Sequence, residues 1–483
     1  RHGRFRIPAV RPASGGGGDI MTARPMGQSM LGSEVAVLLD TFRRLLRRKA
    51  TANLRRLIGK THAADMAMLF RYFNDPEKSA IFTLIREDRE TTGELLSELD
   101  ETLISELLTP LAPPEVASML EDMGSDDVAD ILNLLEDEQA KAILETLQQK
   151  ESEELEELMA YAEDSAGGLM SVDVFSLPES TKAMDAITAI QSSEKAEMVF
   201  YLYVTDEESH LTGVVSLRDL VTAPAGAELK AIMEKDVVSV TAEMDQEEVA
   251  RMVSRYNLLA IPVVESDTTL LGIITVDDVV DVIREEATED FLQMAGIGKD
   301  KEILMKSTFD NVKLRLPWLF ASWIGGTVVA YVIGAFESFL ESVIALAAFI
   351  PVIIGMGGNV GTQSSTIIVR GFATGRLELS RLGSVIWKEM RVGLILGAFY
   401  GLLLGGVAMM KFIDAPPELG LVVGLSICVS MIIATSIGTL VPIFLRKLDV
   451  DPAIASGPFV TTAIDILGIL AYFLIAISLI STI

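Results

Sequence analysis

Cysteine and histidine are nearly absent from this 483-residue chain. Cys428 is the only cysteine, and the histidines are His2, His62 and His210. A disulfide framework is therefore excluded, and a zinc site built from thiolate and imidazole ligands is not expected. The sequence also shows no nucleophile–base pair and no glycine-rich phosphate loop ahead of a helix. These absences argue against an enzyme.

Aromatic residues are scarce as well, at 6% of the chain, although hydrophobic residues make up 50%. The hydrophobic excess therefore comes from aliphatic side chains and alanine. This hydrophobic fraction is high for a soluble protein. It is typical of a chain in which a soluble part is joined to membrane-embedded helices.

Basic residues are fewer than acidic residues, and this imbalance is unevenly distributed along the chain. The formal net charge is −28, yet the part from Pro317 onward holds 9 acidic and 8 basic residues. The part before Pro317 holds 59 acidic and 32 basic residues. A field of this sign repels nucleic acid and anionic lipid headgroups and attracts cations, although most of these carboxylates simply form a solvated surface.

The N-terminal part is predicted to be helical and acidic. Residues 1–32 are basic and glycine-rich, and we expect them to form a disordered leader. In residues 33–161, apolar side chains recur at three- and four-residue steps, which predicts short stacked helices in an all-α superhelical N-terminal domain. Between Glu94 and Asp164, 22 acidic residues face only two lysines. Such a stack repels itself unless a cation binds it.

An internal duplication follows in residues 162–286. The stretches LTGVVSLRDLV (211–221) and LLGIITVDDVV (270–280) match position by position, 59 residues apart, and each follows an apolar strand. This pattern of alternating strands and helices predicts an α/β fold. The two repeats resemble a tandem pair of cystathionine-β-synthase (CBS) domains.

The C-terminal part is predicted to span a membrane five times. A connecting (plug) segment, 287–315, has apolar residues at helical spacing and leads from the CBS pair into a transmembrane domain of five α-helices, 316–483. Basic residues lie in the second and fourth linkers between the spans, so the N-terminal domains are expected in the cytosol and the C-terminus outside. The predicted spans are 316–336, 343–369, 392–412, 419–445 and 453–482, each long enough to cross a bilayer.

The second span contains PVIIGMGGNVGTQSS (351–365), which is unusual for a helix facing lipid. Its proline and glycines predict a broken backbone that lines an ion path, because freed carbonyls are ligands for hard cations. The alternative is close helix packing through small residues.

Asp465 is the residue most indicative of ion conduction. It lies midway along the fifth span and is the only acidic residue that the sequence places well inside a span. A carboxylate at the bilayer centre costs about 2.5–3.5 kcal/mol on insertion scales, and no lysine, arginine or histidine lies deep enough to pair with it. Thr461 and Thr462 lie on nearly the same helix face. A twofold dimer would bring two such carboxylates to one divalent ion, which Mg²⁺ could meet while still hydrated.

Four stretches together resemble the MgtE family of magnesium channels: PVIIGMGGNVGTQSSTIIVRG, DPAIASGPFVTTAID, EDSAGGLM and TVDDVVDVIREEATED. The resemblance covers the chain from about residue 33 onward. It implies a homodimer with a central Mg²⁺ path, closed by cytosolic domains when Mg²⁺ is plentiful. The family's pore and mouth positions fall on Asp465, Thr461, Asn359, Glu341 and Asp451.

The resemblance also implies a metal sensor in the cytosolic domains. Position 257 is asparagine where the family has a carboxylate, which puts one sensor site in doubt. The sensor positions fall on Asp122, Asp126, Gly167, Glu247, Asp278, Asp281, Glu286, Glu289 and Asp290.

The CBS pair carries a second candidate site, for an adenine nucleotide such as ATP. Ser216 with Asp219, and Thr275 with Asp278, have the spacing in which a hydroxyl faces phosphate and a carboxylate accepts from ribose. The alternative is that both carboxylates only begin helices, where they are favoured. Asp278 cannot freely serve both a ribose and a metal ion.

The leading hypothesis is therefore a multi-pass cell-membrane Mg²⁺ channel with negative feedback. Mn²⁺, Co²⁺ and Ni²⁺ are further ions that it could carry. A carrier coupled to Na⁺ or protons is an alternative of the same class, and a membrane-anchored nucleotide sensor is an alternative of another class. A broken second span and Asp465 argue against the membrane-anchored sensor, because helices that only anchor a protein need neither feature.

Overall fold

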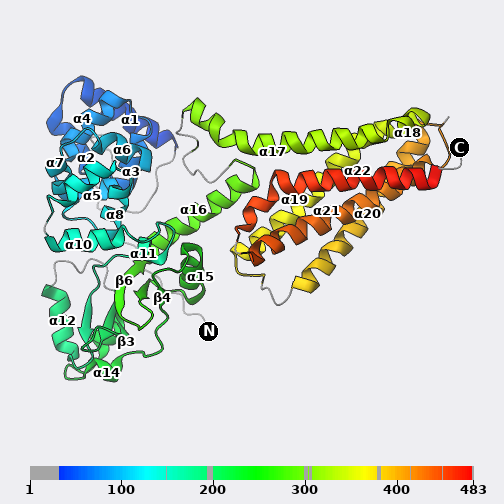
Figure 1. Cartoon of the computed structure of the whole chain (residues 1–483). Coiled ribbons are helices and arrows are strands. Elements are labelled where there is room, and N and C mark those ends of the chain that lie inside the picture. Colours follow the sequence, from blue (N-terminus) through cyan, green and yellow to red (C-terminus); the bar gives the residue numbers. More distant parts are fainter. Residues whose placement is uncertain are drawn as a thin grey trace, which may run out of the picture. The chain divides into compact units, whose positions relative to one another are not determined.

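The computed structural model describes residues 32–147, 149–192, 200–297, 303, 307–377, 382–413, 415–448 and 450–480. Residues 1–31 of the expected leader lie outside this part. The chain forms two compact units, Arg1–Leu107 with Ser118–Asp122, and Leu108–Ala117 with Met123–Ile483. Figure 1 labels the helices and strands.

Short helices fill the chain up to residue 158, as predicted. Their ends are set by local side chains: at the start of α4, Asn74 Oδ1 accepts from the Glu77 amide at 3.0 Å and Glu77 Oε2 accepts from the Asn74 amide at 3.1 Å. The helices are α1 (Gly32–Arg47), α2 (Thr51–Ile58), α3 (Ala63–Phe70), α4 (Asp75–Ile85), α5 (Arg89–Ser97), α6 (Glu101–Leu108), α7 (Pro113–Leu120), α8 (Ser125–Asn133), α9 (Asp137–Leu144) and α10 (Gln149–Leu158).

A series of ion pairs links elements of the first unit that lie about 30 residues apart in the chain. Each pair joins a basic side chain to a carboxylate about one helical hairpin later in the chain, and each contributes little alone because it is partly solvated. No lysine or arginine occurs between Arg89 and Lys141, so the following acidic helices receive no such partner from their own stretch. The pairs are Arg43–Glu77, Arg55–Glu87, Arg71–Asp100, Lys78–Glu106 and Arg89–Glu121.

The duplicated region forms two three-stranded sheets with the same topology, which confirms the predicted repeat. In each sheet the first strand pairs parallel with the second, and the second pairs antiparallel with the third. Equivalent glycines occupy equivalent registers, since Val204 pairs with Gly213 and Val263 with Gly272. The strands are β1 (Ser176–Pro178), β2 (Tyr201–Thr205), β3 (Leu211–Ser216), β4 (Val240–Thr241), β5 (Ala260–Val264) and β6 (Leu270–Thr275).

The two sheets meet through their hairpin turns. The Leu211 amide donates to the Thr268 carbonyl at 2.9 Å, and the Leu270 amide donates to the Ser209 carbonyl at 3.1 Å. This reciprocal pair relates the repeats by a pseudo-twofold axis. The helices of this region are α11 (Ala166–Leu169), α12 (Ala183–Ser192), α13 (Leu217–Thr222), α14 (Leu229–Ile232), α15 (Gln246–Tyr256) and α16 (Val276–Met294).

Helix α16 is one continuous helix of 19 residues that begins directly after β6. The predicted boundary between the CBS pair and the connecting segment, at 286/287, falls inside it. The helix ends at Met294 with Ala295 as its C-cap, and Gly296 takes a left-handed conformation with φ +70°. The first eight residues of the predicted connecting segment, 287–294, therefore continue the helix of the second CBS repeat.

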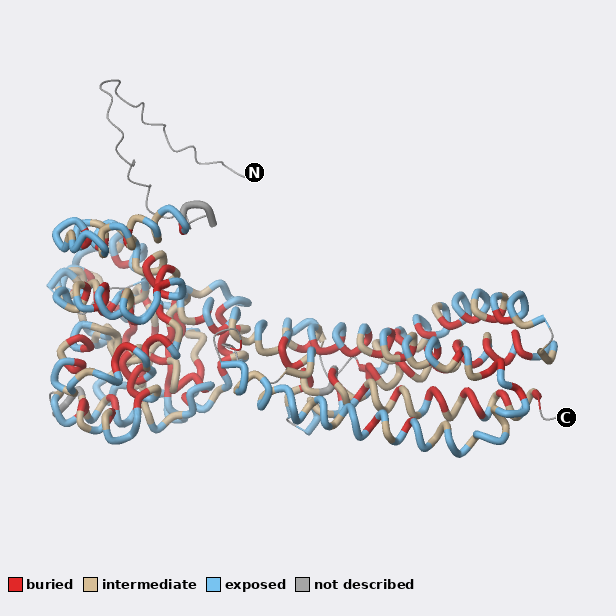
Figure 2. The backbone as a smooth tube through the Cα atoms, turned by 90° about the horizontal axis from the view of Figure 1, so that it is seen from above, coloured by how far each residue is buried: buried red, intermediate tan, exposed pale blue. Residues whose placement is uncertain are grey.

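Five described helices are long and apolar enough to cross a membrane, as predicted. Half of the most apolar stretch of α21 is buried, against 11% of that of α17, so α21 is the most enclosed of these helices. Figure 2 shows buried and exposed residues alternating along the helices of this part of the chain. Short elements α18 (Glu337–Ser342), η1 (Ile344–Phe349) and η3 (Pro452–Ser456) join the helices. The five are α17 (Thr308–Ala335), α19 (Ile350–Ala373, preceded by η1), α20 (Leu382–Lys411), α21 (Leu419–Lys447) and α22 (Pro458–Ile480).

Helix α20 begins ten residues before the predicted third span. Charged residues lower the hydropathy there without ending the helix: Lys388 and Arg391 are exposed, whereas Glu389 is buried at 6% exposure. Glu389 lies seven residues after the start of α20 and outside the predicted span, and it is a buried carboxyl group that sequence analysis did not select.

The predicted break in the second span is also wrong, since α19 is a continuous helix from Ile350 to Ala373. Two of its glycines, Gly357 and Gly361, serve close packing, the alternative considered above. A side chain at Gly361 would meet Ile464 of α22, and one at Gly438 of α21 would meet the Gly361 carbonyl oxygen. The helix backbones thus touch, which only residues without a Cβ allow.

We expect Gly438→Ala to destabilise the membrane domain by about 1–3 kcal/mol, because the new methyl group would overlap a backbone oxygen that cannot rotate away. Gly406→Ala is the matched control, since among the described residues no atom lies within 4 Å of a Cβ built there. Thermal unfolding of both variants in the same detergent measures the difference. Equal melting temperatures would contradict this packing.

Candidate ion path and metal sensor

Asp465 lies on α22 and is half-buried. Within the described part of the chain its carboxylate has no hydrogen bond and no ion pair. Its neighbour Ile464 is buried and packs where Gly357 and Gly361 leave room. One turn earlier, the Thr461 hydroxyl donates to the Pro458 carbonyl at 3.2 Å, which leaves its oxygen able to accept. Asp465 is thus a half-buried carboxylate with no structural partner among the described residues of its protomer.

Helix α19 carries a polar stripe on the face turned away from the bundle. Asn359 and Gln363 are exposed at four-residue spacing, with Thr366 one turn further on, while the opposite face of the helix is buried. Sequence analysis selected Asn359 but missed Gln363 and Thr366. The three- and four-residue periodicity of these polar residues could have identified them.

Glu341 and Asp451 lie toward opposite ends of the membrane helices. Gly357 approaches Ser430 and Gly361 approaches Gly438, so α19 and α21 run parallel. Glu341 precedes α19, and Asp451 follows α21. Asp451 also begins η3, where its Oδ1 accepts from the Ala453 amide at 2.8 Å.

An acidic cluster joins the second CBS repeat to the membrane domain. Burial raises the pKa of Asp290 on α16 to about 7, with further contributions from the charges of Asp451, Glu247 and Glu286. Arg370 opposes that shift. Burial also raises the pKa of Glu247. The structure thus brings together three predicted sensor residues and one predicted mouth residue, and their mutual repulsion favours a bound cation.

Neutral side chains hold part of this cluster in place. Gln246 Nε2 donates to Glu286 Oε1 at 2.5 Å, which ties α15 to α16. Gln293, which is 1% exposed, donates from Nε2 to Glu289 Oε1 at 2.7 Å. Glu289 is therefore oriented by its own helix.

A second cluster forms between α8 and α16. Burial raises the pKa of Asp126 to about 8, and the charges of Asp127 and Asp278 add to this shift. Burial likewise raises the pKa of Asp278 to about 6. The Val172 amide donates to Ser125 Oγ at 3.0 Å, so the start of α8 is fixed against the CBS region. Asp126 and Asp278, both predicted for the sensor, therefore share one electrostatic environment.

The remaining sensor positions are spread more widely. Asp281 is exposed on α16, and Asp122 is exposed and belongs to the first compact unit. Gly167 is buried, and a Cβ there would overlap the Tyr161 ring, so its identity has a steric reason. Asn257 ends α15 in a left-handed conformation with φ 53°, which asparagine tolerates well.

The four predicted nucleotide-binding residues lie at two helix starts, and of the two N-cap residues only Ser216 makes a side-chain cap hydrogen bond. Ser216 Oγ donates to Asp219 Oδ2 at 2.6 Å and accepts from the Asp219 amide at 3.1 Å at the start of α13. Thr275 Oγ1 donates to Asp278 Oδ2 at 2.6 Å at the start of α16. Asp278 also faces Asp126, so its metal and nucleotide assignments compete. Nucleotide binding stays a prediction.

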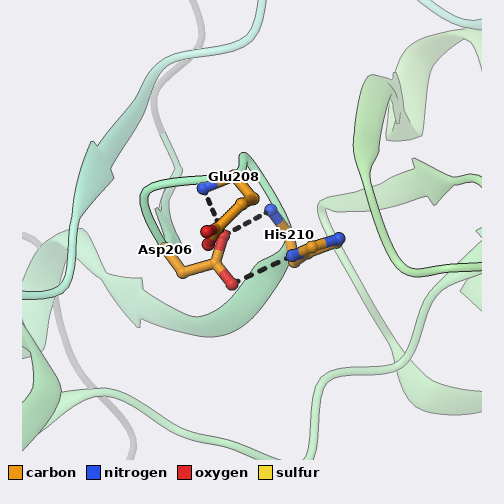
Figure 3. A group of neighbouring side chains, drawn as sticks. All are labelled: Asp206, Glu208 and His210. Atoms are coloured by element: carbon orange, nitrogen blue, oxygen red, sulfur yellow. Dashed lines mark hydrogen bonds and ion pairs between the residues drawn. The ribbon is translucent and has the colours of Figure 1, made fainter.

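Asp206, Glu208 and His210 form another group of ligand-type side chains, which sequence analysis did not select (Figure 3). Asp206 Oδ1 accepts from the amides of Glu208 at 3.0 Å and His210 at 2.9 Å, and Oδ2 lies 3.0 Å from His210 Nδ1. The hydrogen bond to Asp206 raises the pKa of His210. The Asp206 carboxylate closes the β2–β3 turn, and this role accounts for the group.

Comparison with protein families covers all three parts of the chain. The family described as a divalent cation transporter matches residues 350–475. The MgtE intracellular N domain matches residues 61–164, and the CBS domain matches 166–226 and 229–285. These ranges follow the helical region, the two repeats and the membrane helices described above.

Curated relatives match over most of their length. The magnesium transporter MgtE of Bacillus subtilis is 42% identical over 324 residues, 66% of this chain and 70% of the relative. The magnesium transporter MgtE of Thermus thermophilus is 40% identical over 327 residues, 67% of this chain and 72% of the relative. A solved structure, the cytosolic domain of the Mg²⁺ channel MgtE in complex with ATP, is 33% identical, with a TM-score of 0.48; the match covers 50% of this chain and 99% of that one. The chain therefore belongs to the MgtE family of magnesium transporters.

Proposed function

We propose that this protein is a Mg²⁺ channel that admits Mg²⁺ to the cytosol and is closed by cytosolic Mg²⁺. The observation that carries the proposal is Asp465, a carboxylate on a candidate membrane helix with no hydrogen bond or ion pair among the residues that the structure describes. An unpaired carboxylate at that depth is costly and marks an ion pathway. Mg²⁺ fits because it retains its waters and needs only one or two carboxylates.

A homodimer would complete the path. The polar stripe of Asn359, Gln363 and Thr366 is exposed in a single protomer, where it would otherwise face lipid. A twofold axis beside this stripe would bring two Asp465 carboxylates to one divalent ion, and closed twofold dimers are the commonest oligomers. The largely exposed α17 offers apolar surface to lipid or to the second copy.

Closure would act through α16. Asp290 on this helix lies near Asp451, which begins η3, and η3 leads into α22 with Asp465. A cation shared by Asp290, Asp451, Glu247 and Glu286 would turn repulsion into attraction and hold α16 against the cytosolic mouth. The basic residues of the second and fourth loops favour a cytosolic position for this mouth and for the N-terminus.

Mg²⁺ uptake into proteoliposomes at varied internal Mg²⁺ tests the proposal. We expect uptake without any Na⁺ or proton gradient and its suppression as internal Mg²⁺ rises. Uptake that requires either gradient would indicate a coupled carrier, and uptake that internal Mg²⁺ does not affect would refute feedback. If the protein takes up no Mg²⁺ but is still stabilised by Mg²⁺ binding, the alternative of a membrane-anchored sensor without transport would be favoured.

The sensor should bind Mg²⁺ more tightly as the pH rises from 6 to 8. Asp126 and Asp278 have raised pKa values of about 8 and about 6, so at low pH the ion must displace protons. An acid with a raised folded pKa makes the Mg²⁺-free protein less stable as pH rises from 3.8 to about 8, and the loss then levels off. Mg²⁺ should recover that stability.

Thermal unfolding with and without Mg²⁺ across this pH range measures the effect. The Mg²⁺ concentration that gives half the stabilisation should fall by up to about tenfold per pH unit where one proton is released. Asp126→Asn should flatten the dependence. If the half-stabilising Mg²⁺ concentration of Asp126→Asn still depends steeply on pH, titrating groups other than Asp126 cause the dependence.

An adenine nucleotide is a further regulatory ligand that we propose for the CBS pair, at Ser216 and Asp219. Asp219 is exposed, and its carboxylate is held by the Ser216 hydroxyl. Calorimetric titration of ATP into the wild type and Ser216→Ala tests this separately from Mg²⁺ binding.

A further inference from the structure

Helix α20 carries a basic and aromatic face near its start. Trp387 and Lys388 lie four and three residues before Arg391, so the three side chains share one face of the helix, and all three are exposed. Glu389 is buried on another side, where Ser364 of α19 donates from Oγ to its Oε2 at 3.0 Å. This hydrogen bond fixes the rotation of α20 with its basic face turned outward.

The side of α20 that packs against the protein is a stripe of glycines. A Cβ built on Gly393 would meet Thr435 of α21, and one built on Gly401 would meet the Gly424 carbonyl oxygen. This close contact leaves the opposite side of α20 at the edge of the bundle (Figure 1). None of the helices that the structure describes covers the basic face.

The depth of this face in the membrane follows from the sequence of α20. No charged residue lies between Arg391 and Lys411. At 1.5 Å per residue the 19 residues between them span about 28 Å, close to the hydrocarbon core of about 30 Å. Arg391 and Lys411 therefore mark the two surfaces of the core, and Lys388 lies about one turn beyond Arg391, at the depth of the lipid headgroups.

The basic side chains of this face are available to a ligand. Within the described part of the chain, neither Lys388 nor Arg391 pairs with a carboxylate. Arg391 donates from Nε to the Trp387 carbonyl at 3.4 Å, which leaves its two terminal nitrogens for another acceptor. A guanidinium binds phosphate through two parallel hydrogen bonds, and a lysine three residues away can reach the same group. Tryptophan is favoured at this depth because its ring is apolar and its N–H is polar.

The charge of the remaining chain means that any attraction to an anionic lipid must be local. The part before Pro317 holds 59 acidic and 32 basic residues, so its field repels anionic headgroups. A zwitterionic headgroup carries its own ammonium group, whereas two adjacent cations favour a headgroup with a net negative charge. We propose that Trp387, Lys388 and Arg391 bind the headgroup of an anionic phospholipid at the outer side of α20. This site does not depend on ion conduction.

Quenching of Trp387 fluorescence by brominated lipids tests the site. Trp318→Phe/Trp323→Phe leaves Trp387 as the only tryptophan of the full-length protein. This variant is reconstituted in phosphatidylcholine vesicles that contain a varied fraction of brominated phosphatidylglycerol or of brominated phosphatidylcholine. Each basic residue near a membrane surface contributes about a fivefold preference for an anionic lipid, so brominated phosphatidylglycerol should reach half-maximal quenching at an about 25-fold lower fraction. Equal quenching by the two lipids, or no quenching by either, would overturn the proposal.

Neutral variants in the same background test which residues cause the preference. Lys388→Gln/Arg391→Gln should abolish the preference, and Lys388→Gln alone should lower it about fivefold. Lys411→Gln is the matched control, because Lys411 is exposed at the opposite end of the same helix, and it should leave the preference unchanged. A preference that persists in the double variant would overturn the proposal. Displacement of the brominated phosphatidylglycerol by millimolar inorganic phosphate would also overturn it and would indicate a site for free phosphate.

Discussion

Replacing Asp465 by asparagine is expected to reduce Mg²⁺ uptake about a hundredfold or more while leaving the fold intact. The substitution keeps the size of the side chain but removes the charge from the middle of α22 in each protomer. A loss of about 3 kcal/mol of attraction for the ion lowers its occupancy by about a hundredfold. Uptake into proteoliposomes measures the loss, and thermal unfolding checks the fold.

Asn359→Ala and Gln363→Ala are the comparison variants for Asp465→Asn. They remove uncharged groups from the exposed stripe of α19, so they should change the rate or the preference among Mg²⁺, Mn²⁺, Co²⁺ and Ni²⁺ more than occupancy. Near-normal uptake by Asp465→Asn would refute the pore assignment. Equal loss in all three variants, with ion preference unchanged, would mean that charge and polar lining do not have separate roles.

Neutralising Asp290 and Asp451 together should leave the channel open at internal Mg²⁺ that closes the wild type. These carboxylates come from α16 and from the start of η3, and their proximity contributes to the raised pKa of Asp290. A shared cation contributes coupling of about 1–3 kcal/mol per site, so the inhibitory Mg²⁺ concentration should rise about 5- to 150-fold. Patch recordings of Asp290→Asn/Asp451→Asn measure this shift.

Glu248→Gln is the matched control for that experiment, since Glu248 is exposed beside Glu247 on α15. It should leave inhibition unchanged. A double variant that stays shut at every Mg²⁺ concentration would show that repulsion alone opens the pore. In that case the bound ion would only relieve the repulsion between Asp290 and Asp451 and would not bridge α16 and η3.

Local and periodic features of the fold could be predicted from the sequence. The duplication fixed the two sheets because equivalent residues, Gly213 and Gly272, face the same need for close packing in each repeat. The five spans followed from hydropathy. The ends of the helices could not be predicted from hydropathy, because a helix can include charged residues such as Lys388 whose side chains stay exposed.

The site was harder to predict where it depends on distant segments. Glycines of α19 looked like a break, but their partners, Ile464 and Gly438, lie about 80–100 residues later and become visible only in the folded bundle. The raised pKa values of Asp126 and Asp290 likewise arise from burial and from carboxylates on other elements. Family resemblance supplied these residues, and the structure supplies the physical reason for grouping them.

The continuity of α16 has a mechanical consequence. A helix of 19 residues is about 28 Å long, so a tilt of about 10° at β6 would carry its far end through about 5 Å. Such a lever converts a small rotation at the sheet into a displacement of several ångström at the membrane end of the helix. The cytosolic repeats could therefore remain nearly rigid during gating, with the stroke generated by leverage.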